Sequence, residues 1–552
     1  MILLISLLTT SAFAQITQDD FLRTSEGTPG PQHIVNAKGE KVHLRGTNVG
    51  GWLVQESWMC PTDMDGLAAG DQISMLRKLA ERFGTQVRDE LIDLYEDNYW
   101  TEADFDNCAA MGMNVLRLSF TYMNLVHIDE GPNYHTLKPG AFKRFDWFIE
   151  NAGKRGIYVI LDMHGAFGSQ NGMDHSGEIN DGWQLYNNAY NREKTIWLWG
   201  EIAKRYVGNP IVAMYDLLNE PGPKAGYTNK TQWDFFDEVY KEIRKHDPGH
   251  IITIESCWGA EHLPDPSTYG WTNVVYQYHY YGWGDLIDDA AKTNKFIDSN
   301  VRNIQEANYD VPTFVGEFTF FGLLTSWDYG LGVYNQHGWS WTSWTYKAHG
   351  HSSWGLYNHS PTKARPASDT EAQIRTRWGS DIRTNNGGWV HTDVKNEVEK
   401  KLPGRAAKPI MIPGDSGVSA TFNANDLVKK SLEVSANNDS NGRYIGHLID
   451  GSFVEYLIEV PHRPRPRSRG ARYTMTIQAA RGENSGKHHL LIFANDKKVG
   501  EIAIRNGDNW HDFAPLSTDI LLLEGIQTLR LVSTGSVNIS DISIELADLV
   551  SR

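Results

Sequence analysis

Apolar runs of strand length alternate with amphipathic helical stretches between Val42 and Tyr346. The runs are nearly continuous in apolar residues, and the stretches between them, such as Thr231–His246, carry apolar residues at helical spacing. Strands of this kind are typical of parallel sheets covered by helices, so eight such units predict a (β/α)8 TIM barrel. A doubly wound open sheet is the alternative, but no G-x-G-x-x-G turn follows the first run. The predicted strands are Val42–Gly50, Asn114–Phe120, Tyr158–His164, Ile211–Glu220, His250–Glu255, Asn273–Tyr281, Pro312–Phe318 and Trp339–Tyr346.

The pattern changes at Leu402–Gly417, where proline and glycine punctuate the sequence LPGRAAKPIMIPGDSG. Helical periodicity is largely lost after it, and short alternating strands predict a C-terminal β-sandwich. A chain of 552 residues is also too long for one ordinary core. We therefore expect a barrel over residues 15–402, a linker over 403–417 and a sandwich over 418–552. The predicted sandwich strands are Glu455–Val460, Tyr473–Ala479, His489–Ala494, Lys498–Ile504, Thr528–Ser533 and Ile539–Ile544.

The N-terminus, MILLISLLTTSAFAQ, has an apolar stretch followed by Ala12-Phe13-Ala14, an A-x-A cleavage pattern. It lacks the usual positively charged start, but it still predicts a signal peptide over residues 1–14. No later run approaches the roughly 20 apolar residues of a membrane span. We expect a secreted protein, extracellular or periplasmic, without a membrane span.

Composition narrows the range of partners. The net charge of −16 and the pI of about 5.7 disfavour nucleic acid, because an acidic surface repels phosphates. Cys60, Cys108 and Cys257 form neither a metal-binding spacing nor a disulfide framework. The 19 Trp and 24 Tyr are many, and aromatic faces stack well on flat apolar surfaces such as those of sugar rings. A large aromatic core would explain most of them equally well.

Polar, ionisable and aromatic residues end nearly every predicted strand, and the fourth ends on Asn219-Glu220-Pro221. In a closed barrel these carboxyl ends share one rim, which is where barrel enzymes carry their chemistry. Glu220 and Glu317, at the ends of strands four and seven, would meet there. Glycoside hydrolysis with retention needs two carboxyl groups about 5–5.5 Å apart, one as acid and one as nucleophile. Arg117 could keep Glu317 anionic, which would leave Glu220 as the acid.

The residues at these strand ends resemble family 5 of the glycoside hydrolases, a retaining (β/α)8 group. The resemblance rests on Asn219-Glu220-Pro221, on Gly316-Glu317-Phe318 and on His279-x-Tyr281. Two further stretches, Arg45–Met59 and Asp162–Gly177, closely resemble the exo-β-1,3-glucanases of yeasts. The resemblance covers roughly Ile34 to Leu402 and is strongest at the strand ends.

The resemblance implies a role for each matching residue. Glu220 is the acid/base and Glu317 the nucleophile, which Arg117 and Tyr281 hold in place. Asn219 hydrogen-bonds the sugar 2-hydroxyl. His164, His279, Trp344 and Trp354 surround the −1 sugar, with Trp354 as its floor and Trp344 as support or aglycone wall.

Glu56 and Asp174 match two carboxylates that grip the far hydroxyls of a terminal glucose, so they imply a blind pocket and exo action. The chain departs from the yeast pattern at Met173 and at Trp283, where phenylalanines clamp the acceptor sugar. Met173 can still pack on a sugar face. Trp283 either replaces the clamp or only packs.

The C-terminal sequence resembles carbohydrate-binding modules of family 6 and its relatives. In such modules a tyrosine, a tryptophan and an asparagine hold a sugar, and the matching residues are Tyr444, Trp510 and Asn538. Asn425 and Asp426 stand where these modules carry an acidic residue that helps bind a structural calcium. The alternative is a sandwich that only packs on the barrel.

Together these patterns predict a retaining hydrolase that releases glucose from the ends of β-1,3-glucan, and we expect it to be a monomer. An endo-acting β-1,3-, β-1,6- or β-1,4-glucanase is the alternative enzyme, and a non-catalytic glycan-binding protein is the alternative class. The two-carboxylate chemistry calls for no metal and no organic cofactor. The expected partner is a β-glucan polysaccharide or oligosaccharide.

Overall fold

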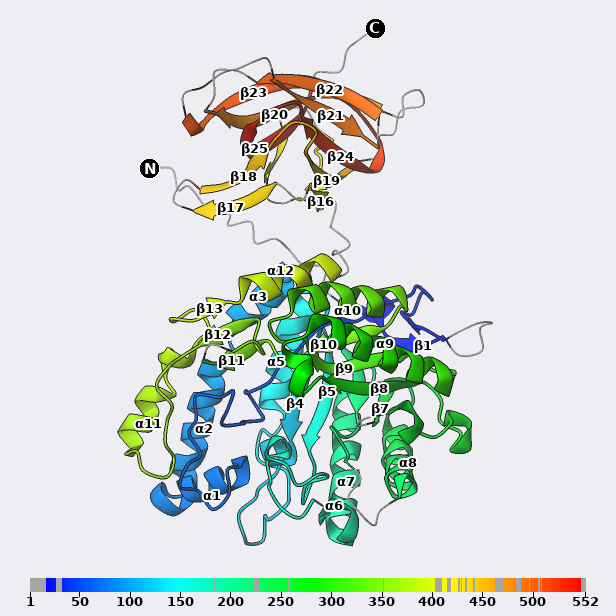
Figure 1. The fold of residues 1–552 in the computed structure, drawn as a ribbon, viewed down its shortest axis with the longest axis vertical. Coiled ribbons are helices and arrows are strands. Elements are labelled where there is room, and N and C mark those ends of the chain that lie inside the picture. The colour runs from blue at the N-terminus through cyan, green and yellow to red at the C-terminus, as the bar shows by residue number, and fades with distance from the viewer. Residues whose placement is uncertain are drawn as a thin grey trace. The chain divides into compact units, whose positions relative to one another are not determined.

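The chain forms two compact units, Met1–Pro403 and Gly404–Arg552, in the computed structural model (Figure 1). The predicted signal peptide and most of the predicted linker lie outside the described residues. The structure describes the chain except residues 1–15, 26–31, 183, 223–227, 257–258, 351, 403–409, 415–417, 425–426, 428, 432–433, 440–441, 462–469, 483–487, 496, 505–506, 508 and 548–552.

Eight parallel strands of the first unit close into a barrel in chain order, and the last, β10, pairs with the first, β3. The predicted barrel is confirmed, and each predicted strand overlaps one observed strand. Nearly every strand residue is buried, because side chains fill the inside and helices cover the outside. The strands are β3 (Arg45–Asn48), β4 (Val115–Thr121), β5 (Tyr158–Gly165), β6 (Val212–Asp216), β7 (Ile251–Ser256), β8 (Val274–Tyr281), β9 (Thr313–Thr319) and β10 (Ser340–Ser343).

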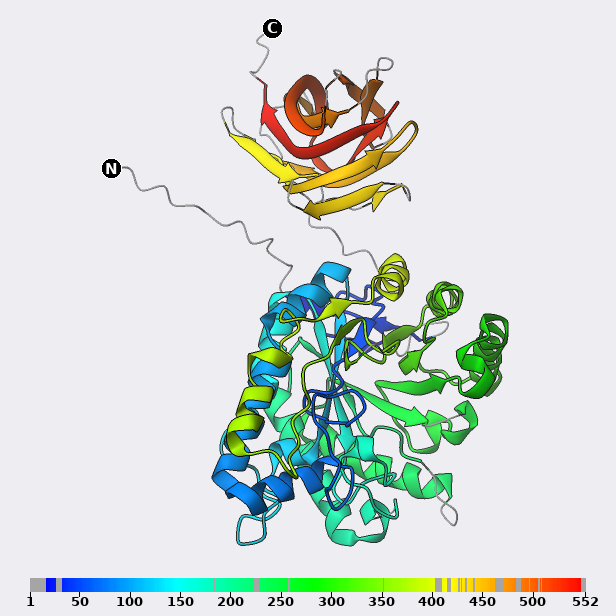
Figure 2. The same ribbon diagram turned by 60° about the vertical axis from the view of Figure 1, so that its left-hand side comes forward.

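Helices surround this barrel (Figures 1 and 2). The described part of the connection from β7 to β8 holds only two short 3-10 turns, η3 (Ala260–His262) and η4 (Pro266–Thr268). The α-helices are α1 (Gln72–Phe83), α2 (Thr85–Tyr99), α3 (Glu102–Met111), α4 (Tyr122–Leu125), α5 (Lys143–Lys154), α6 (Gln184–Asn187), α7 (Ala189–Tyr206), α8 (Asn229–His246), α9 (Ala290–Ala307), α10 (Leu324–Gln336), α11 (Glu371–Arg377) and α12 (Thr392–Lys401). Short strands outside the barrel are β1 (Arg23–Thr24), β2 (Ile34–Val35), β11 (Lys347–His349), β12 (Tyr357–His359) and β13 (Trp389–Val390).

The fourth barrel strand, β6, ends earlier than predicted. It stops at Asp216, and the chain continues irregularly to Glu220, which has a left-handed backbone with φ of +40°. Here the backbone N–H of Glu220 donates to the Glu255 side chain at 3.0 Å instead of to a neighbouring strand. A non-glycine residue held in this conformation is typical of sites where the surrounding structure fixes a functional side chain.

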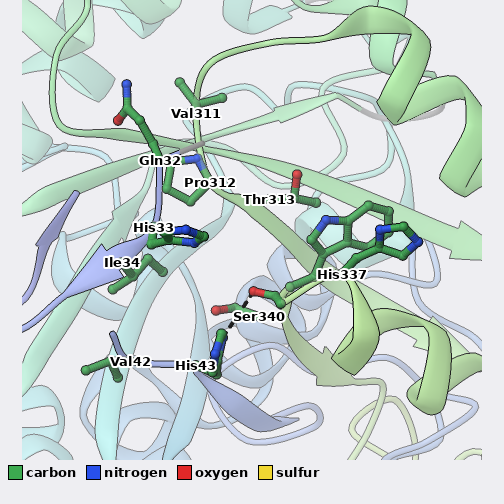
Figure 3. A pocket seen from close by; sticks show the side chains of 12 residues that line it. Gln32, His33, Ile34, Val42, His43, Val311, Pro312, Thr313, His337 and Ser340 are labelled. Atoms are coloured by element: carbon green, nitrogen blue, oxygen red, sulfur yellow. Dashed lines mark hydrogen bonds between the residues drawn. The ribbon is translucent and has the colours of Figure 1, made fainter. Parts of the chain in front are cut away.

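The amino ends of the barrel strands are closed by an apolar cluster that includes Ile34, Met214 and Phe314. A cavity of about 120 Å³ lies near this end, between the β2 segment and the starts of β9 and β10 (Figure 3). Its lining includes His33, His43 and His337, and His43 Nδ1 lies 3.1 Å from the Gly338 carbonyl oxygen. Polar residues at this end of a barrel generally serve stability, whereas catalytic residues lie at the opposite rim.

The second unit is a β-sandwich of two six-stranded sheets, as predicted. One sheet has the order β14-β19-β24-β21-β22 with β16 beside β19, and the other β17-β18-β25-β20-β23 with β15 beside β25. Part of the predicted linker belongs to this unit, because Ile410–Met411 forms β14. The strands are β14 (Ile410–Met411), β15 (Ser419–Asn423), β16 (Lys429–Lys430), β17 (Ser435–Asp439), β18 (Gly442–Leu448), β19 (Phe453–Val460), β20 (Gly470–Arg481), β21 (His488–Ala494), β22 (Lys497–Ile504), β23 (Asn509–Leu523), β24 (Gly525–Ser533) and β25 (Val537–Leu546).

None of the helices in the described part of the chain combines the length and the apolar content that crossing a bilayer requires.

Candidate active site

The carboxyl ends of the barrel strands surround a pocket of about 420 Å³. Carboxylates, imidazoles and indoles make up most of its wall. The lining residues are Glu56, Trp58, His164, Met173, Asp174, His175, Glu220, Tyr281, Trp283, Glu317, Trp344 and Trp354.

Glu220 and Glu317 meet in this pocket from opposite sides of the barrel. One carboxylate oxygen of each lies within 4.8 Å of the other. The Glu220 side chain is 17% exposed and that of Glu317 is 5% exposed, so both carboxylates face the cavity while most of each side chain is buried. This spacing is close to the carboxyl separation of about 5–5.5 Å that retaining glycoside hydrolysis requires.

Glu317, on β9, is held at both carboxylate oxygens. Arg117 Nη1 donates to Oε1 at 2.7 Å, and the Tyr281 hydroxyl donates to Oε2 at 2.7 Å. Both bonds are short, and the one from the Arg117 guanidinium is charge-assisted. The predicted contacts of Arg117 and Tyr281 with this side chain are therefore present in the structure.

Arg117, on β4, is fully buried beneath the pocket and links four strands. Besides Glu317, it donates through Nε to Asp216 at 2.7 Å and through Nη2 to Asn219 Oδ1 at 3.0 Å. Nη1 also donates to Asn48 Oδ1 at 3.1 Å. A planar guanidinium bound at every nitrogen has little freedom to rotate, so Arg117 fixes the position of Glu317.

Glu220 lies between two histidines. Oε1 is 3.0 Å from His279 Nδ1, and Oε2 is 3.5 Å from His175 Nε2. Burial favours the neutral carboxyl, but the hydrogen bond with His279 and the nearby His175 outweigh it and lower the pKa of Glu220 to about 2. In the empty site Glu220 is therefore an anion, and the protons near it reside on its neighbours.

His279 and Glu255 are those neighbours. Burial disfavours an imidazolium, but the carboxylates of Glu255 and Glu317 and the bond to Glu220 raise the pKa of His279 to about 9. Burial also holds the pKa of Glu255 well above its usual range, against the opposing effect of His279. Glu255 Oε1 lies 3.3 Å from His279 Nδ1, the same nitrogen that faces Glu220 at 3.0 Å, so one imidazole stands between two carboxylates.

His164, on β5, is a neutral residue of the pocket wall. Nδ1 lies 2.6 Å from Asp162 Oδ2, and the ring stacks on Trp344 with centroids 5.2 Å apart. Burial lowers the pKa of His164 to about 3. With its proton on Nδ1 and directed to Asp162, the ring presents Nε2 as an acceptor for a sugar hydroxyl.

Glu56 has an oxygen that lacks a partner within the described residues. Oε2 accepts from Trp58 Nε1 at 2.7 Å, while the buried Oε1 receives no hydrogen bond. Burial raises the pKa of Glu56 to about 7, and the charge of Asp174 contributes in the same direction. A buried acceptor without a donor is costly, and a sugar hydroxyl entering the pocket would supply one.

Indole rings form the outer wall of the pocket. Trp354 packs on Tyr281, Trp58 and Trp283, with ring centroids 5.5, 5.2 and 5.9 Å apart. Trp283 is 60% exposed and Met173 is 54% exposed, so both present apolar surface at the mouth. Met173 and Trp283, where the sequence departs from the yeast pattern, thus lie at the mouth of the pocket. The pocket carboxylates do not differ from that pattern.

The structure brings the predicted barrel residues to one rim, with one difference in depth. Arg117, Asn219 and His279 lie outside the pocket lining. Arg117 and His279 contact the pocket carboxylates, and Asn219 accepts from Arg117. Sequence reasoning missed residues of two kinds. His175 and Trp58 lie within the matched stretches but received no role. Glu255, at the end of β7, received none either, and its side chain is buried.

Glu220, His279 and Glu317 also form a group whose donor atoms could meet on one ion. Each of the three side chains already has a partner: His175 for Glu220, Glu255 for His279 and Arg117 for Glu317. A reaction that proceeds through two carboxylates also requires no metal ion. That the chemistry needs no metal stays a prediction.

The second unit has a pocket of its own, of about 470 Å³. Tyr444 on β18, Trp510 on β23 and Asn538 on β25 all line it, so the three predicted residues lie together. Asn538 Nδ2 donates to the Trp510 carbonyl at 2.9 Å, and the Tyr444 hydroxyl lies 3.0 Å from His511 Nε2. The predicted calcium residues, Asn425 and Asp426, lie outside the described residues.

Comparisons with known proteins agree with this geometry. Residues 35–350, more than half of the chain, match the family model described as cellulase, glycosyl hydrolase family 5. A β-xylosidase of Phanerodontia chrysosporium is 32% identical over 45% of this chain and 50% of its own length. A probable glucan 1,3-β-glucosidase A of Emericella nidulans is 31% identical over 50% of this chain and 67% of its own.

The match thus spans between half and two thirds of these relatives. Among solved structures, rutinosidase from Aspergillus niger superposes with a TM-score of 0.45 and 19% identity, over 61% of this chain and 97% of that one. The family model alone covers all eight barrel strands. The chain belongs to family 5 of the glycosyl hydrolases.

Proposed function

We propose that the protein is a retaining β-glycosidase that releases glucose from the non-reducing ends of β-1,3-glucan. The proposal rests on the carboxylate pair. Oxygens of Glu220 and Glu317 lie within 4.8 Å of each other, and Glu220 contacts His279 whereas Glu317 contacts Arg117. The secretion signal predicted at residues 1–14 would place such an enzyme outside the cell.

In the first step Glu317 attacks the anomeric carbon, and the glycosidic oxygen leaves with a proton from Glu220. Arg117 and Tyr281 each donate to one oxygen of Glu317 and so fix the position of its carboxylate in the pocket. Glu220 is anionic in the empty site, so it must gain a proton before this step. His279, whose Nδ1 lies 3.0 Å away, is the adjacent titratable group.

In the second step a water molecule replaces the departed sugar or aglycone. Glu220, again an anion, takes a proton from this water, which then attacks the anomeric carbon and releases Glu317. The interactions that lower the pKa of Glu220 favour this base form. Two displacements at one carbon return the original β configuration.

The exo assignment rests on the far wall of the pocket. Glu56 has an unpartnered oxygen there, and Asp174 lies beside it in the lining. The curated relatives include both a β-xylosidase and glucan 1,3-β-glucosidases, and xylose differs from glucose in lacking the 6-hydroxymethyl group. The sugar at the −1 position is therefore part of the proposal.

Product analysis tests this proposal. We expect laminarin, a soluble β-1,3-glucan, to yield glucose alone from the earliest time point, and the released glucose to be the β-anomer by NMR. A ladder of oligosaccharides would replace the exo assignment with endo action, and release of the α-anomer would contradict retention. Faster turnover of an aryl β-xyloside than of the aryl β-glucoside would overturn the choice of glucose.

Glu56 should control binding more than chemistry. We expect Glu56→Ala to raise KM for laminarin-derived oligosaccharides by about tenfold, since it removes a hydrogen-bonding group from a buried site. Glu261→Ala, an exposed carboxylate on the same unit, is the matched control and should change neither KM nor kcat. An unchanged KM for Glu56→Ala would remove Glu56 from the pocket wall.

For the second unit we propose a sugar-binding role. The pocket that gathers Tyr444, Trp510 and Asn538 supports it, because one aromatic face and a few polar groups around a cavity suit a carbohydrate. A sandwich that serves only to pack on the barrel would need no such pocket.

Replacing Trp510 tests this role without touching the barrel. Trp510→Ala should weaken retention of the full chain on insoluble β-1,3-glucan by about fivefold, from the loss of one stacking ring. Hydrolysis of an aryl β-glucoside should stay within twofold of the unsubstituted protein. Equal retention of both proteins would contradict sugar binding by this unit.

A further inference from the structure

Glu255, near the carboxyl end of β7, lies outside the pocket lining and takes no step of its own in the proposed reaction. Its side chain is fully buried, and Arg117 Nη2 lies 4.0 Å from its Oε2. Burying a carboxyl group is costly unless its oxygens are paired, so the contacts of Glu255 indicate what it does.

One oxygen of Glu255 binds the backbone of Glu220. Oε2 accepts from the Glu220 N–H at 3.0 Å. The Glu220 carbonyl oxygen in turn accepts from Asn171 Nδ2 at 3.1 Å. The peptide groups on both sides of the Glu220 Cα are therefore held by side chains that lie far away in the sequence.

These bonds matter because Glu220 has a left-handed backbone, with φ of +40°. A residue other than glycine keeps this conformation only where the surrounding structure fixes it. The backbone sets the direction of the side chain, so relaxation of this segment would move the Glu220 carboxylate relative to Glu317. A retaining mechanism needs the two carboxyl groups about 5–5.5 Å apart. A displacement of about 1 Å can cost on the order of a hundredfold in rate.

Gln277, a buried residue on β8, holds Glu255 in turn. Its Nε2 donates to the same Glu255 Oε2 at 3.0 Å. Gly316, directly before Glu317 on β9, leaves room for this amide, since a Cβ at Gly316 would lie 2.5 Å from Gln277 Cδ. The contacts therefore run from the strand of Glu317, through Gln277 and Glu255, to the backbone of Glu220.

We propose that Glu255 is a positioning residue, which holds Glu220 in its left-handed conformation and so sets the distance between the two reacting carboxylates. This inference rests on the proposed roles of Glu220 and Glu317. The contact requires no charge on Glu255, because a neutral carboxyl still accepts through one oxygen, and so does an amide. The role is therefore geometric, and an isosteric amide should perform it.

The test compares two substitutions at this position in the full chain. Glu255→Leu offers the Glu220 N–H no acceptor, whereas Glu255→Gln keeps an oxygen for it. We expect Glu255→Leu to lower kcat/KM on laminarin by about 30- to 100-fold, because the acid is misplaced. On 2,4-dinitrophenyl β-glucoside its kcat/KM should fall by less than about threefold, since dinitrophenolate leaves without a proton. Glu255→Gln should stay within about fivefold on both substrates.

Asp247→Ala is the matched control for loss of a buried carboxylate. Asp247 precedes the opposite end of β7 and likewise accepts a backbone N–H, that of His250, at 3.0 Å. Its loss should lower thermal stability without changing the ratio of the two kcat/KM values, laminarin over aryl glucoside. Gln277→Met removes the donor to Glu255 and should lower this ratio in the same direction as Glu255→Leu, but by less.

Equal ratios in Glu255→Leu and Asp247→Ala would overturn the positioning role, as would a Glu255→Gln variant as impaired as Glu255→Leu, which would assign the effect to charge. If Glu255→Leu does not fold, an unchanged ratio in Gln277→Met overturns the role instead. An unchanged ratio in Glu220→Gln would overturn the proposed function itself. A ratio that falls in Glu220→Gln but not in Glu255→Leu would overturn this inference alone.

Discussion

Glu317→Gln is expected to lower kcat on both laminarin and aryl β-glucosides by about four orders of magnitude or more, since no covalent intermediate can then form. The amide keeps the shape of the side chain: its oxygen can accept from Arg117, and its NH2 group can donate to the Tyr281 hydroxyl, in place of the two bonds of 2.7 Å that now hold the carboxylate. We therefore expect the variant to fold and to bind oligosaccharides with an affinity near that of the unsubstituted protein.

Steady-state rates, circular dichroism and an oligosaccharide binding isotherm are the measurements, and Glu261→Gln is the control for loss of an exposed carboxylate. A mass-spectrometric readout is sharper. A 2-fluoro-glucosyl donor should attach to the peptide that contains Glu317 in the unsubstituted protein and to no peptide in the variant. Labelling at Glu220 or Glu255 instead would assign the nucleophile to another carboxylate of the same cluster.

The barrel could be predicted because its signal is repeated. Each strand is buried on both faces, so the apolar runs appear in the sequence without knowledge of their partners. The sandwich strands have a weaker sequence pattern than the barrel strands. β23 was missed because it lies at the edge of its sheet, where most of its residues are exposed, and because Pro515 interrupts its pattern. Its sequence has no clear alternation of apolar and polar residues that would predict a strand.

The catalytic pair could be predicted for a similar reason, since strand ends of one barrel must share a rim. Glu255 could not. Its sequence position is equally suited to a solvated residue, and its role depends on contacts with the N–H of Glu220 and with His279 that form only in the closed barrel. His175 is a second example. It lies in a matched stretch, yet only the folded loop brings it within 3.5 Å of Glu220.

Glu220→Gln should separate the two steps of the proposed reaction. We expect kcat/KM on laminarin to fall by about 10²- to 10⁴-fold, the range that one general acid supplies. Aryl glucosides with acidic leaving groups should lose far less in the first step, since their phenolates leave without a proton. The plot of log(kcat/KM) against leaving-group pKa should therefore become steeper than for the unsubstituted protein.

The second step gives an independent check on the same variant. Without Glu220 as base, water attacks the glycosyl-enzyme slowly, whereas azide needs no base and should restore turnover by forming a β-glucosyl azide. The same azide should leave Glu317→Gln inactive, because that variant forms no intermediate to intercept. If azide restores neither variant, or if laminarin and activated aryl glucosides lose activity equally in Glu220→Gln, the acid/base role belongs elsewhere. His279 would then be the first candidate, since its imidazolium lies 3.0 Å from the same position and carries the nearest proton.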